Sequence, residues 1–309
     1  MNSGHTDVIT PSTGIRSFQK EGHTVIWGDA LEALESEVKD GSIQLIFADP
    51  PYNIGKQFAN FLDRWPSDAD YAKWCEKWLA ICIRKLSPNG SLYVMSSTQC
   101  MPYLDLFLRD RVEIISRIVW HYDSSGVQAR SKFGSMYEPI LFCAKDSKNY
   151  IFNSEEIKIE APTGSRRKLI DYRKAVPTQY STMKVPGNAW YFPRVRYRMP
   201  EYEDHPSQKP MALMERIVLA SSNPGDIVLD PFSGTFTTSA AAKKHGRNSI
   251  GIELAEEYVK IGLRRLSIQE TLDGERLQSL TKNYARKNDM RKLKARNEGQ
   301  MSLFHDKNQ

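Results

Sequence analysis

Apolar residues follow two different spacings along this chain, and the two spacings alternate. Short apolar runs with no polar face predict buried strands, at residues 23–27, 43–48 and 91–96. From Tyr71 to Leu86 the apolar side chains instead recur at i, i+3, i+4 and i+7, which predicts a helix with one buried face. Asp68 or Asp70 is expected to cap that helix. Strands that alternate with helices indicate an α/β sheet.

This rhythm is interrupted in the middle of the chain and then resumes. Further strands are predicted at 114–121, 140–144, 227–230 and 249–253, and further helices at 211–220, 237–245 and 256–266. From residue 122 to residue 204, basic residues alternate with Tyr, Trp and Phe, while Gly and Pro recur without a helical period. This composition is typical of an irregular insertion with little core of its own.

We therefore expect one α/β unit that is divided by an insertion. The expected parts are a flexible N-terminal segment, the first half of the unit, the insertion, the second half and a basic C-terminal extension, at residues 1–22, 23–121, 122–204, 205–266 and 267–309. The extension is expected to be helical in part, and its last ten residues to be disordered.

Composition fits a globular protein and excludes several other classes. Of the 309 residues, 40% are hydrophobic and 26% are charged, which suffices for a core. The apolar runs are shorter than the roughly 18–20 residues of a membrane span, and the polar start lacks a signal peptide. A cytoplasmic protein without membrane contact is expected. The four cysteines show no CxxC spacing, which favours neither a metal site nor a disulfide framework.

The net charge of +6 is unevenly distributed. Residues 122–198 hold 14 basic and 7 acidic side chains, and residues 260–309 hold 12 and 6, whereas the rest of the chain is mildly acidic. Two separate basic blocks favour a shared anionic partner, such as nucleic acid, over an ordinary mixed surface.

The first candidate site is the sequence Asp49-Pro50-Pro51-Tyr52, which directly follows a predicted strand. Ligands of open α/β sheets bind beyond the carboxyl ends of strands. Because proline has no N–H, the Asp49 carboxylate and the Pro50 carbonyl remain as acceptors for the two N–H groups of an exocyclic amine. Tyr52 offers a ring on which a base can stack. The alternative is a rigid turn with an exposed aromatic residue.

A second candidate site follows the strand predicted at 227–230. The sequence Asp230-Pro231-Phe232-Ser233-Gly234 opens the next helix, and a glycine in such a turn lets a ligand approach backbone N–H groups. Glu253 lies 23 residues after Asp230, at the tip of the next strand, where an acidic residue can bind ribose hydroxyls. Together these features indicate a nucleoside-type cofactor, and an ordinary turn between strand and helix is the alternative.

A third segment, His205-Pro206-Ser207-Gln208-Lys209-Pro210, precedes the helix predicted at 211–220. Its prolines stiffen a loop in which Lys209 can meet a carboxylate. His205 is assigned no catalytic role, because a lone histidine is more often structural.

Taken together, these motifs resemble the β group of amino-methylating DNA methyltransferases, which use S-adenosylmethionine (SAM). The matching segments are residues 28–30, 46–53, 187–190, 205–210, 230–236 and 251–253. They occur in the permuted order of that group, with the catalytic motif first, the target-recognition region next and the cofactor motif last. The resemblance is greatest to solitary enterobacterial adenine methyltransferases. It implies a Rossmann-like methyltransferase sheet with helices on both faces and an inserted target-recognition region.

The resemblance also implies roles for individual residues. Asp49 and Pro50 would hold the target amine, with Pro51 in the same rigid turn, and Tyr52 would stack on a base flipped out of double-stranded DNA. Cofactor contacts are implied for Asp29, Ala30, Asp49, Lys209, Asp230, Phe232, Ser233, Gly234 and Glu253. Phe236 departs from the family pattern, which often has glycine there, and is not expected to contact the cofactor.

The implied reaction transfers a methyl group from SAM to adenine N6, and it requires no metal. Asp rather than Ser at position 49 favours adenine N6 over cytosine N4, which remains open as a second target. Two acceptors on the amine would localise its lone pair and stabilise the positive charge that develops during attack. Two further hypotheses stay open, namely a catalytically silent DNA-binding protein and an RNA methyltransferase.

The basic insertion is the expected DNA-binding region. Arg can read guanine in a bidentate manner, and Lys more often holds phosphate, but an ordinary solvated charge is the alternative at each position. The candidates are Arg130, Lys132, Arg166, Arg167, Lys168, Arg173, Lys174, Arg194, Arg196 and Arg198.

A short apolar segment, Gln300-Met301-Ser302-Leu303-Phe304, lies in the otherwise polar tail. It resembles the peptide by which bacterial proteins dock on the replication sliding clamp, with Gln300, Leu303 and Phe304 as anchors. A tail that folds back on its own domain is the alternative. The family resemblance also leads us to expect a homodimer and association with the nucleoid.

Overall fold

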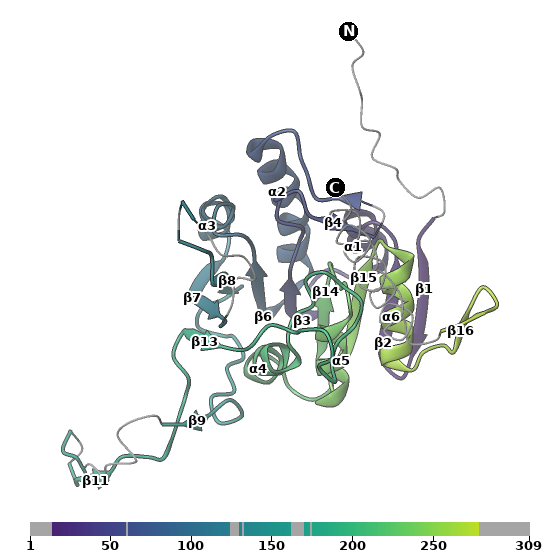
Figure 1. The fold of residues 1–309 in the computed structure, drawn as a ribbon. Coiled ribbons are helices and arrows are strands. Elements are labelled where there is room, and N and C mark those ends of the chain that lie inside the picture. The colour runs from purple at the N-terminus through teal and green to yellow at the C-terminus, as the bar shows by residue number, and fades with distance from the viewer. Residues whose placement is uncertain are drawn as a thin grey trace, which may run out of the picture.

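The computed structural model describes residues 14–59, 61–123, 130–131, 133–161, 170–173 and 175–277. Its centre is a sheet of nine strands (Figure 1): β1 (Arg16–Lys20), β2 (His23–Trp27), β3 (Ile43–Ala48), β6 (Leu86–Met95), β7 (Glu113–His121), β8 (Tyr137–Ala144), β13 (Ala189–Tyr191), β14 (Ile227–Asp230) and β15 (Asn248–Glu253). The order across the sheet is β1-β2-β15-β14-β3-β6-β8-β7-β13.

The middle of this sheet is parallel, which brings distant parts of the sequence to one edge. β2, β15, β14, β3 and β6 are consecutive parallel neighbours, so their carboxyl ends lie together. β8 runs antiparallel to both β6 and β7, and therefore its amino end lies at that same edge. Open α/β sheets bind ligands at this edge.

Helices cover both faces of the sheet, as the sequence predicts. α1 (Ala30–Glu37), α2 (Asp68–Lys85) and α3 (Met101–Arg109) pack on one face with Ile46 of β3. α4 (Met211–Ser221) and α5 (Thr237–Lys244) pack on the other face with Phe47, and α6 (Glu256–Leu266) joins them there against Val25 of β2. Because β3 is covered on both faces, its residues other than Gln44 are apolar without alternation.

Two local predictions at element ends are wrong. The sequence predicts a flexible segment up to residue 22, but β1 pairs antiparallel with β2 as an edge strand. Arg16 further donates to both Asp273 carboxylate oxygens at 3.1 Å. The predicted caps of α2, Asp68 and Asp70, lie inside the helix, and Ser67 caps it by accepting from the Asp70 N–H at 3.1 Å.

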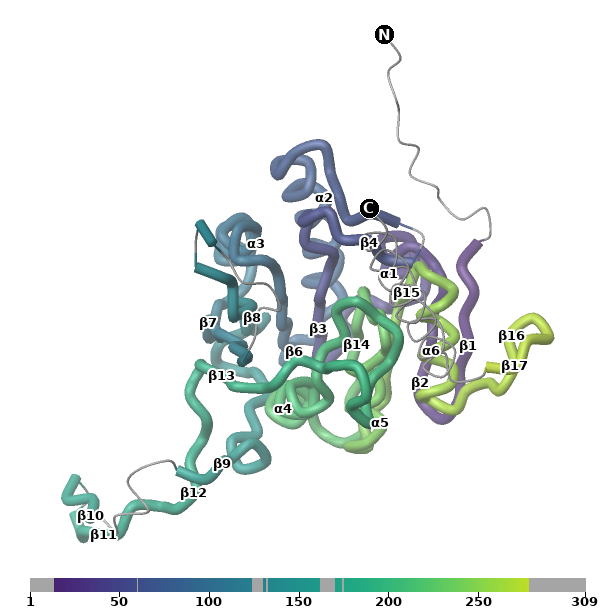
Figure 2. The backbone as a smooth tube through the Cα atoms, viewed as in Figure 1, coloured from purple at the N-terminus to yellow at the C-terminus, as the bar shows by residue number. Residues whose placement is uncertain are grey.

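The region predicted as one insertion, 122–204, contains strands of the central sheet. β8 lies between β6 and β7, and β13 pairs with β7 at the sheet margin. Between β8 and β13 the chain leaves the body as an arm with two short strand pairs (Figure 2), which are β9 (Ile159–Glu160) with β12 (Met183–Lys184) and β10 (Ile170–Asp171) with β11 (Thr178–Gln179).

Of the C-terminal extension, which is predicted to be helical in part, the structure describes only residues 267–277. These residues include a hairpin of β16 (Thr271–Leu272) and β17 (Glu275–Arg276). Among the helices that the structure describes, none has the length and apolar character needed to cross a membrane.

Candidate active site

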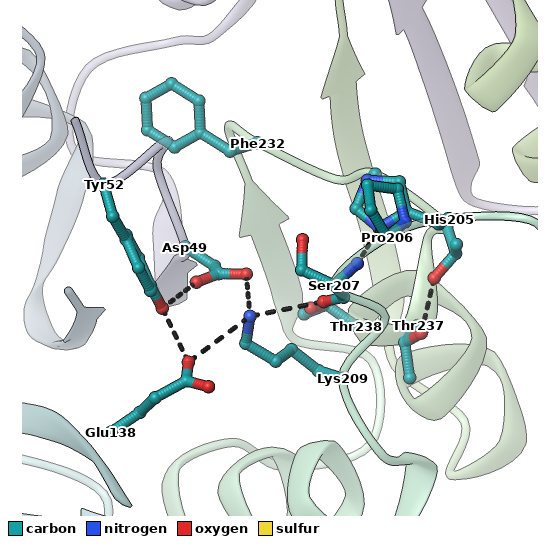
Figure 3. A network of polar contacts seen from close by, with 12 residues as sticks. Asp49, Tyr52, Glu138, His205, Pro206, Ser207, Lys209, Phe232, Thr237 and Thr238 are labelled. Carbon is teal, nitrogen blue, oxygen red and sulfur yellow. Dashed lines mark hydrogen bonds and ion pairs between the residues drawn. The ribbon is translucent and has the colours of Figure 1, made fainter. Parts of the chain in front are cut away.

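Four polar side chains meet beyond the carboxyl end of β3 (Figure 3). The Tyr52 hydroxyl lies 2.5 Å from Asp49 Oδ1 and 2.9 Å from Glu138 Oε2. Lys209 Nζ lies 2.5 Å from Asp49 Oδ2 and 3.7 Å from Glu138 Oε2. We call these four residues the Asp49 cluster. They come from the turn after β3, the amino end of β8 and the loop before α4.

Electrostatics keep Lys209 charged and Tyr52 neutral. Burial alone would lower the pKa of the Lys209 ammonium, but the Asp49 and Glu138 carboxylates outweigh it and raise that pKa. Burial, together with both carboxylates, raises the pKa of the Tyr52 hydroxyl well above its usual value. The cluster therefore contains a positive charge beside acceptors, as well as a hydroxyl with a single hydrogen to donate.

Side chains outside the cluster fix the turn that carries Asp49 and Tyr52. The buried Asp63 carboxylate accepts from the backbone N–H of Tyr52 at 3.2 Å and from that of Lys56. It thereby ties the turn to the hairpin of β4 (Gln57–Phe58) and β5 (Phe61–Leu62). The Tyr71 hydroxyl donates to the Pro51 carbonyl at 2.7 Å. Within the described residues, none donates to the Pro50 carbonyl.

The second predicted site is built on two buried carboxylates. Asp230 accepts from the Phe232 N–H at 3.0 Å and from the Thr238 hydroxyl at 2.6 Å. Glu253 accepts from the Gly234 N–H and from the Ala255 N–H, both at 2.8 Å. Burial raises the pKa of each carboxyl group to about 7. The adjacent turn after β14 is thus held against the tip of β15.

Phe236 occupies a slot that two glycines create. Its backbone φ of 57° lies in the left-handed region that favours glycine, and its ring is fully buried. A Cβ on Gly262 of α6 would lie 2.5 Å from this ring, and one on Gly251 of β15 would lie 2.6 Å from it. The ring therefore points into the core between β15 and α6.

His205 covers the turn that contains Gly234. A Cβ on Gly234 would lie 3.1 Å from its Nε2, and its ring packs edge-on against Tyr258 with centroids 4.4 Å apart. Burial, with a contribution from Lys209, lowers the pKa of His205 to about 3, so its imidazole is neutral near neutral pH. His205 also lines a cavity of about 230 Å³ beside the β4–β5 hairpin and the start of α6.

Other predicted cofactor residues lie along the same edge. Asp29 follows β2 and caps α1, because its carboxylate accepts from the Leu31 N–H at 2.8 Å, and Ala30 is the first residue of that helix. The Phe232 ring packs against Trp78 with centroids 5.1 Å apart. Lys209, which the resemblance implies as a cofactor contact, lies beside Asp49.

Glu138 is the functional candidate that the sequence does not reveal. It stands two residues before the strand predicted at 140–144, so its position close to a strand was visible. Its proximity to Asp49 depends on the antiparallel direction of β8, which the apolar pattern does not specify.

The chain matches known proteins over most of its length. A family model for N6/N4 methyltransferases, described as DNA methylase, covers residues 43–264. DNA adenine methyltransferase YhdJ of Escherichia coli (strain K12) is 56% identical over 265 residues, which are 86% of this chain and 90% of YhdJ. This chain belongs to the DNA methylase family. The resemblance stated from its motifs is therefore confirmed.

Further relatives of this DNA methylase agree in family and fold. Type II methyltransferase M.HpaI of Haemophilus parainfluenzae is 34% identical over 244 residues, 78% of this chain and 73% of that protein. The solved structure of PvuII DNA methyltransferase (cytosine-N4-specific) covers 87% of this chain and 93% of its own, with a TM-score of 0.61 and 18% identity. The M1.HpyAVI–SAM complex covers 78% and 98%, with a TM-score of 0.56 and 24% identity. Both structures share the fold.

The predicted DNA-binding residues of this DNA methylase are only partly described. The Arg194 guanidinium lies 5.0 Å from the ring centroid of Tyr122, and Arg196 pairs with Asp123 at 2.7 Å. Arg198 lies over the ring of Tyr197, Arg173 pairs with Asp171, and Arg130 is exposed. The remaining candidates lie outside the described residues, as do the tail anchors: Lys132, Arg166, Arg167, Lys168, Lys174, Gln300, Leu303 and Phe304.

Proposed function

We propose that this DNA methylase transfers the methyl group of SAM to N6 of adenine in double-stranded DNA. The observation that carries the proposal is the meeting of two turns at one sheet edge. One contains Asp49 and Tyr52, and the other is held by Asp230 and Glu253. The high identity to a protein named as a DNA adenine methyltransferase supports adenine as the target base.

The turn after β14 and the tips of its neighbours fit SAM. Gly234 has no side chain to bar a ligand from the turn, and two buried carboxylates suit a cationic nucleoside. Glu253 binds the ribose hydroxyls, Asp29 with Ala30 lies at the adenine, and the methionine end lies along Asp230, Phe232, Ser233 and Gly234. When bound, SAM supplies an electrophilic methyl group on its sulfonium. The protein provides orientation and electrostatics.

The turn after β3 holds the target amine. Asp49 accepts one N–H and the Pro50 carbonyl accepts the other, since the Pro51 carbonyl is already bonded to Tyr71. Both acceptors withdraw the amine lone pair from conjugation and stabilise the positive charge that develops on N6. Tyr52 stacks on the flipped base, and Pro51 keeps the turn rigid.

Transfer of a tritiated methyl group from SAM to duplex DNA tests this proposal. Wild type should label DNA, and Asp49→Ala should lose about 100-fold or more of the rate while still binding SAM. Nucleoside mass spectrometry should find N6-methyladenine and no N4-methylcytosine. A preference for RNA in competition, or equal counts for wild type and Asp49→Ala, would contradict the proposed function.

We propose two further associations for this chain. The segment 300–304 docks on the bacterial sliding clamp through Gln300, Leu303 and Phe304, and this proposal rests on its apolar anchors in a polar tail. A peptide of residues 295–309 should bind the clamp in calorimetry, and Leu303→Ala with Phe304→Ala should abolish the binding. Homodimerisation, proposed from the family resemblance, is tested by light scattering of the full chain.

A further inference from the structure

We propose that Glu138 is a positioning residue that receives the hydrogen bond of Tyr52 and supports the charge of Lys209 when the target amine occupies Asp49. This inference rests on the proposed function. It assigns a role to a residue that no motif of the sequence revealed.

The strand direction of β8 places Glu138 for this role. Glu138 lies opposite Trp120 of β7, at the amino end of β8, and its side chain is 16% exposed. Its Oε2 is the atom that faces both donors of the cluster, since it lies 2.9 Å from the Tyr52 hydroxyl and 3.7 Å from Lys209 Nζ.

The donors of the cluster now occupy both Asp49 oxygens. Tyr52 lies 2.5 Å from Oδ1, and Lys209 lies 2.5 Å from Oδ2. Each oxygen of an ionised carboxylate can accept more than one hydrogen bond, but an amine that binds Asp49 competes with these two donors, and we expect it to draw the Tyr52 hydroxyl away. A buried hydroxyl or ammonium that loses its acceptor without replacement is destabilised, and this cost would oppose binding of the base.

Glu138 removes that cost because a second acceptor is already in place. The Tyr52 hydroxyl carries one hydrogen and donates it to one carboxylate at a time. When the amine engages Asp49, the hydroxyl turns its hydrogen to Glu138, and Lys209 gains the same carboxylate as its nearest counter-charge. No proton leaves Tyr52 or Lys209, so only the acceptor changes. Asp49 is then free to act on the amine.

A double-mutant cycle on the full-length enzyme tests this exchange. Glu138→Ala removes the second acceptor, and Tyr52→Phe removes the hydroxyl that needs it. We expect Glu138→Ala to lower the single-turnover methyl-transfer rate by about tenfold in the wild type and by clearly less in the Tyr52→Phe background. The dissociation constant for SAM should be unchanged. Glu138→Gln, which keeps an acceptor but no charge, should fall between wild type and Glu138→Ala.

The controls separate this role from a structural one. Glu113→Gln changes an exposed carboxylate at the opposite end of the neighbouring strand β7 and should leave the rate unchanged. If Glu138→Ala does not fold, the same cycle is run with Glu138→Gln. Equal losses in both backgrounds, a wild-type rate for Glu138→Ala, or a rate loss that parallels loss of SAM binding would overturn the inference. Absence of methyl transfer by the wild type would instead overturn the proposed function.

Discussion

At the residue scale, burial makes the carboxyl groups of Asp230 and Glu253 weaker acids than usual. Each carboxyl group has a pKa raised to about 7, although each accepts hydrogen bonds that favour its charged form. Because these pKa values exceed those of the unfolded chain, protonation stabilises the folded state fully below pH ~4 and this contribution is lost as the pH rises through 7. The site therefore holds carboxyl protons that a cationic ligand displaces.

The affinity for SAM should consequently rise between pH 6 and pH 8. Binding favours the ionised carboxylates, so it should release protons, and the dissociation constant should fall by up to about tenfold over this range. Calorimetry in buffers of different ionisation enthalpy measures both quantities. Glu253→Gln should weaken binding and flatten the pH dependence, whereas Glu37→Gln, at an exposed position of α1, should change neither. An unchanged dissociation constant for wild type would contradict this prediction.

The sequence predicts the location of a site residue well where that location depends on local spacing. Asp49 and Asp230 each follow an apolar run, and Glu253 follows the next run, so their common edge was predictable. Glu138 was not predictable, because its place depends on the direction of β8. The contact of Lys209 with Asp49 was also missed, since it depends on how a loop folds over the sheet edge.

At the scale of elements, Phe236 couples β15 to α6. Its ring fills the space that Gly251 and Gly262 leave open, although position 236 has a backbone conformation suited to glycine. The sequence shows the departure from the family pattern but not its compensation. Two glycines on consecutive elements provide the room, and only the packing of β15 against α6 reveals it.

Substitutions at Gly262 should therefore depend on Phe236. Gly262→Ala should destabilise the wild type by about 1–3 kcal/mol, because the added methyl group overlaps a packed ring. In a Phe236→Ala background the same change should be neutral or stabilising, since the cavity accepts the methyl group and alanine favours the helix. Urea unfolding measures both. Gly187→Ala, where no atom lies within 4 Å of the new Cβ, is the control. Additive effects would contradict the coupling.

The strands and helices themselves were largely predictable from the apolar pattern. Strand 227–230 and helix 256–266 were predicted with their observed bounds. In each, the spacing of apolar residues is clear, and turn residues flank the element. β1 was missed because an exposed edge strand needs few apolar residues. The hairpin of β16 and β17 was missed because its two-residue strands are too short for any period.

At the scale of the whole molecule, the acidic residues of the candidate site and the main basic block lie in different parts of the chain. The carboxylates at the sheet edge, Asp49, Asp230 and Glu253, suit an amine and a cationic cofactor. The basic block of 122–198 instead holds 14 basic and 7 acidic residues, and it includes the arm that leaves the sheet. Arg194 lies close enough to the cluster to oppose the charge of Lys209. The two surfaces therefore adjoin, and we predict that they bind different ligands.

Neutralising this basic block should weaken DNA binding and spare SAM binding. Replacing Arg194, Arg196 and Arg198 by Gln should lower the slope of log affinity against log salt by up to about 3, because each phosphate contact contributes about 0.9. The ion pair of Arg196 with Asp123 is exposed, so its loss should cost little stability. Titrations of labelled duplex DNA at several salt concentrations measure this slope.

The control for that prediction changes three exposed lysines that lie outside the basic block to Gln, namely Lys39, Lys73 and Lys77. It alters the net charge by the same amount but leaves the basic block intact. If affinity depended on net charge alone, both triple variants would show the same slope. We expect only the arginine variant to lose slope, with an unchanged dissociation constant for SAM. Equal loss of DNA and SAM binding would show that the two ligands share one surface.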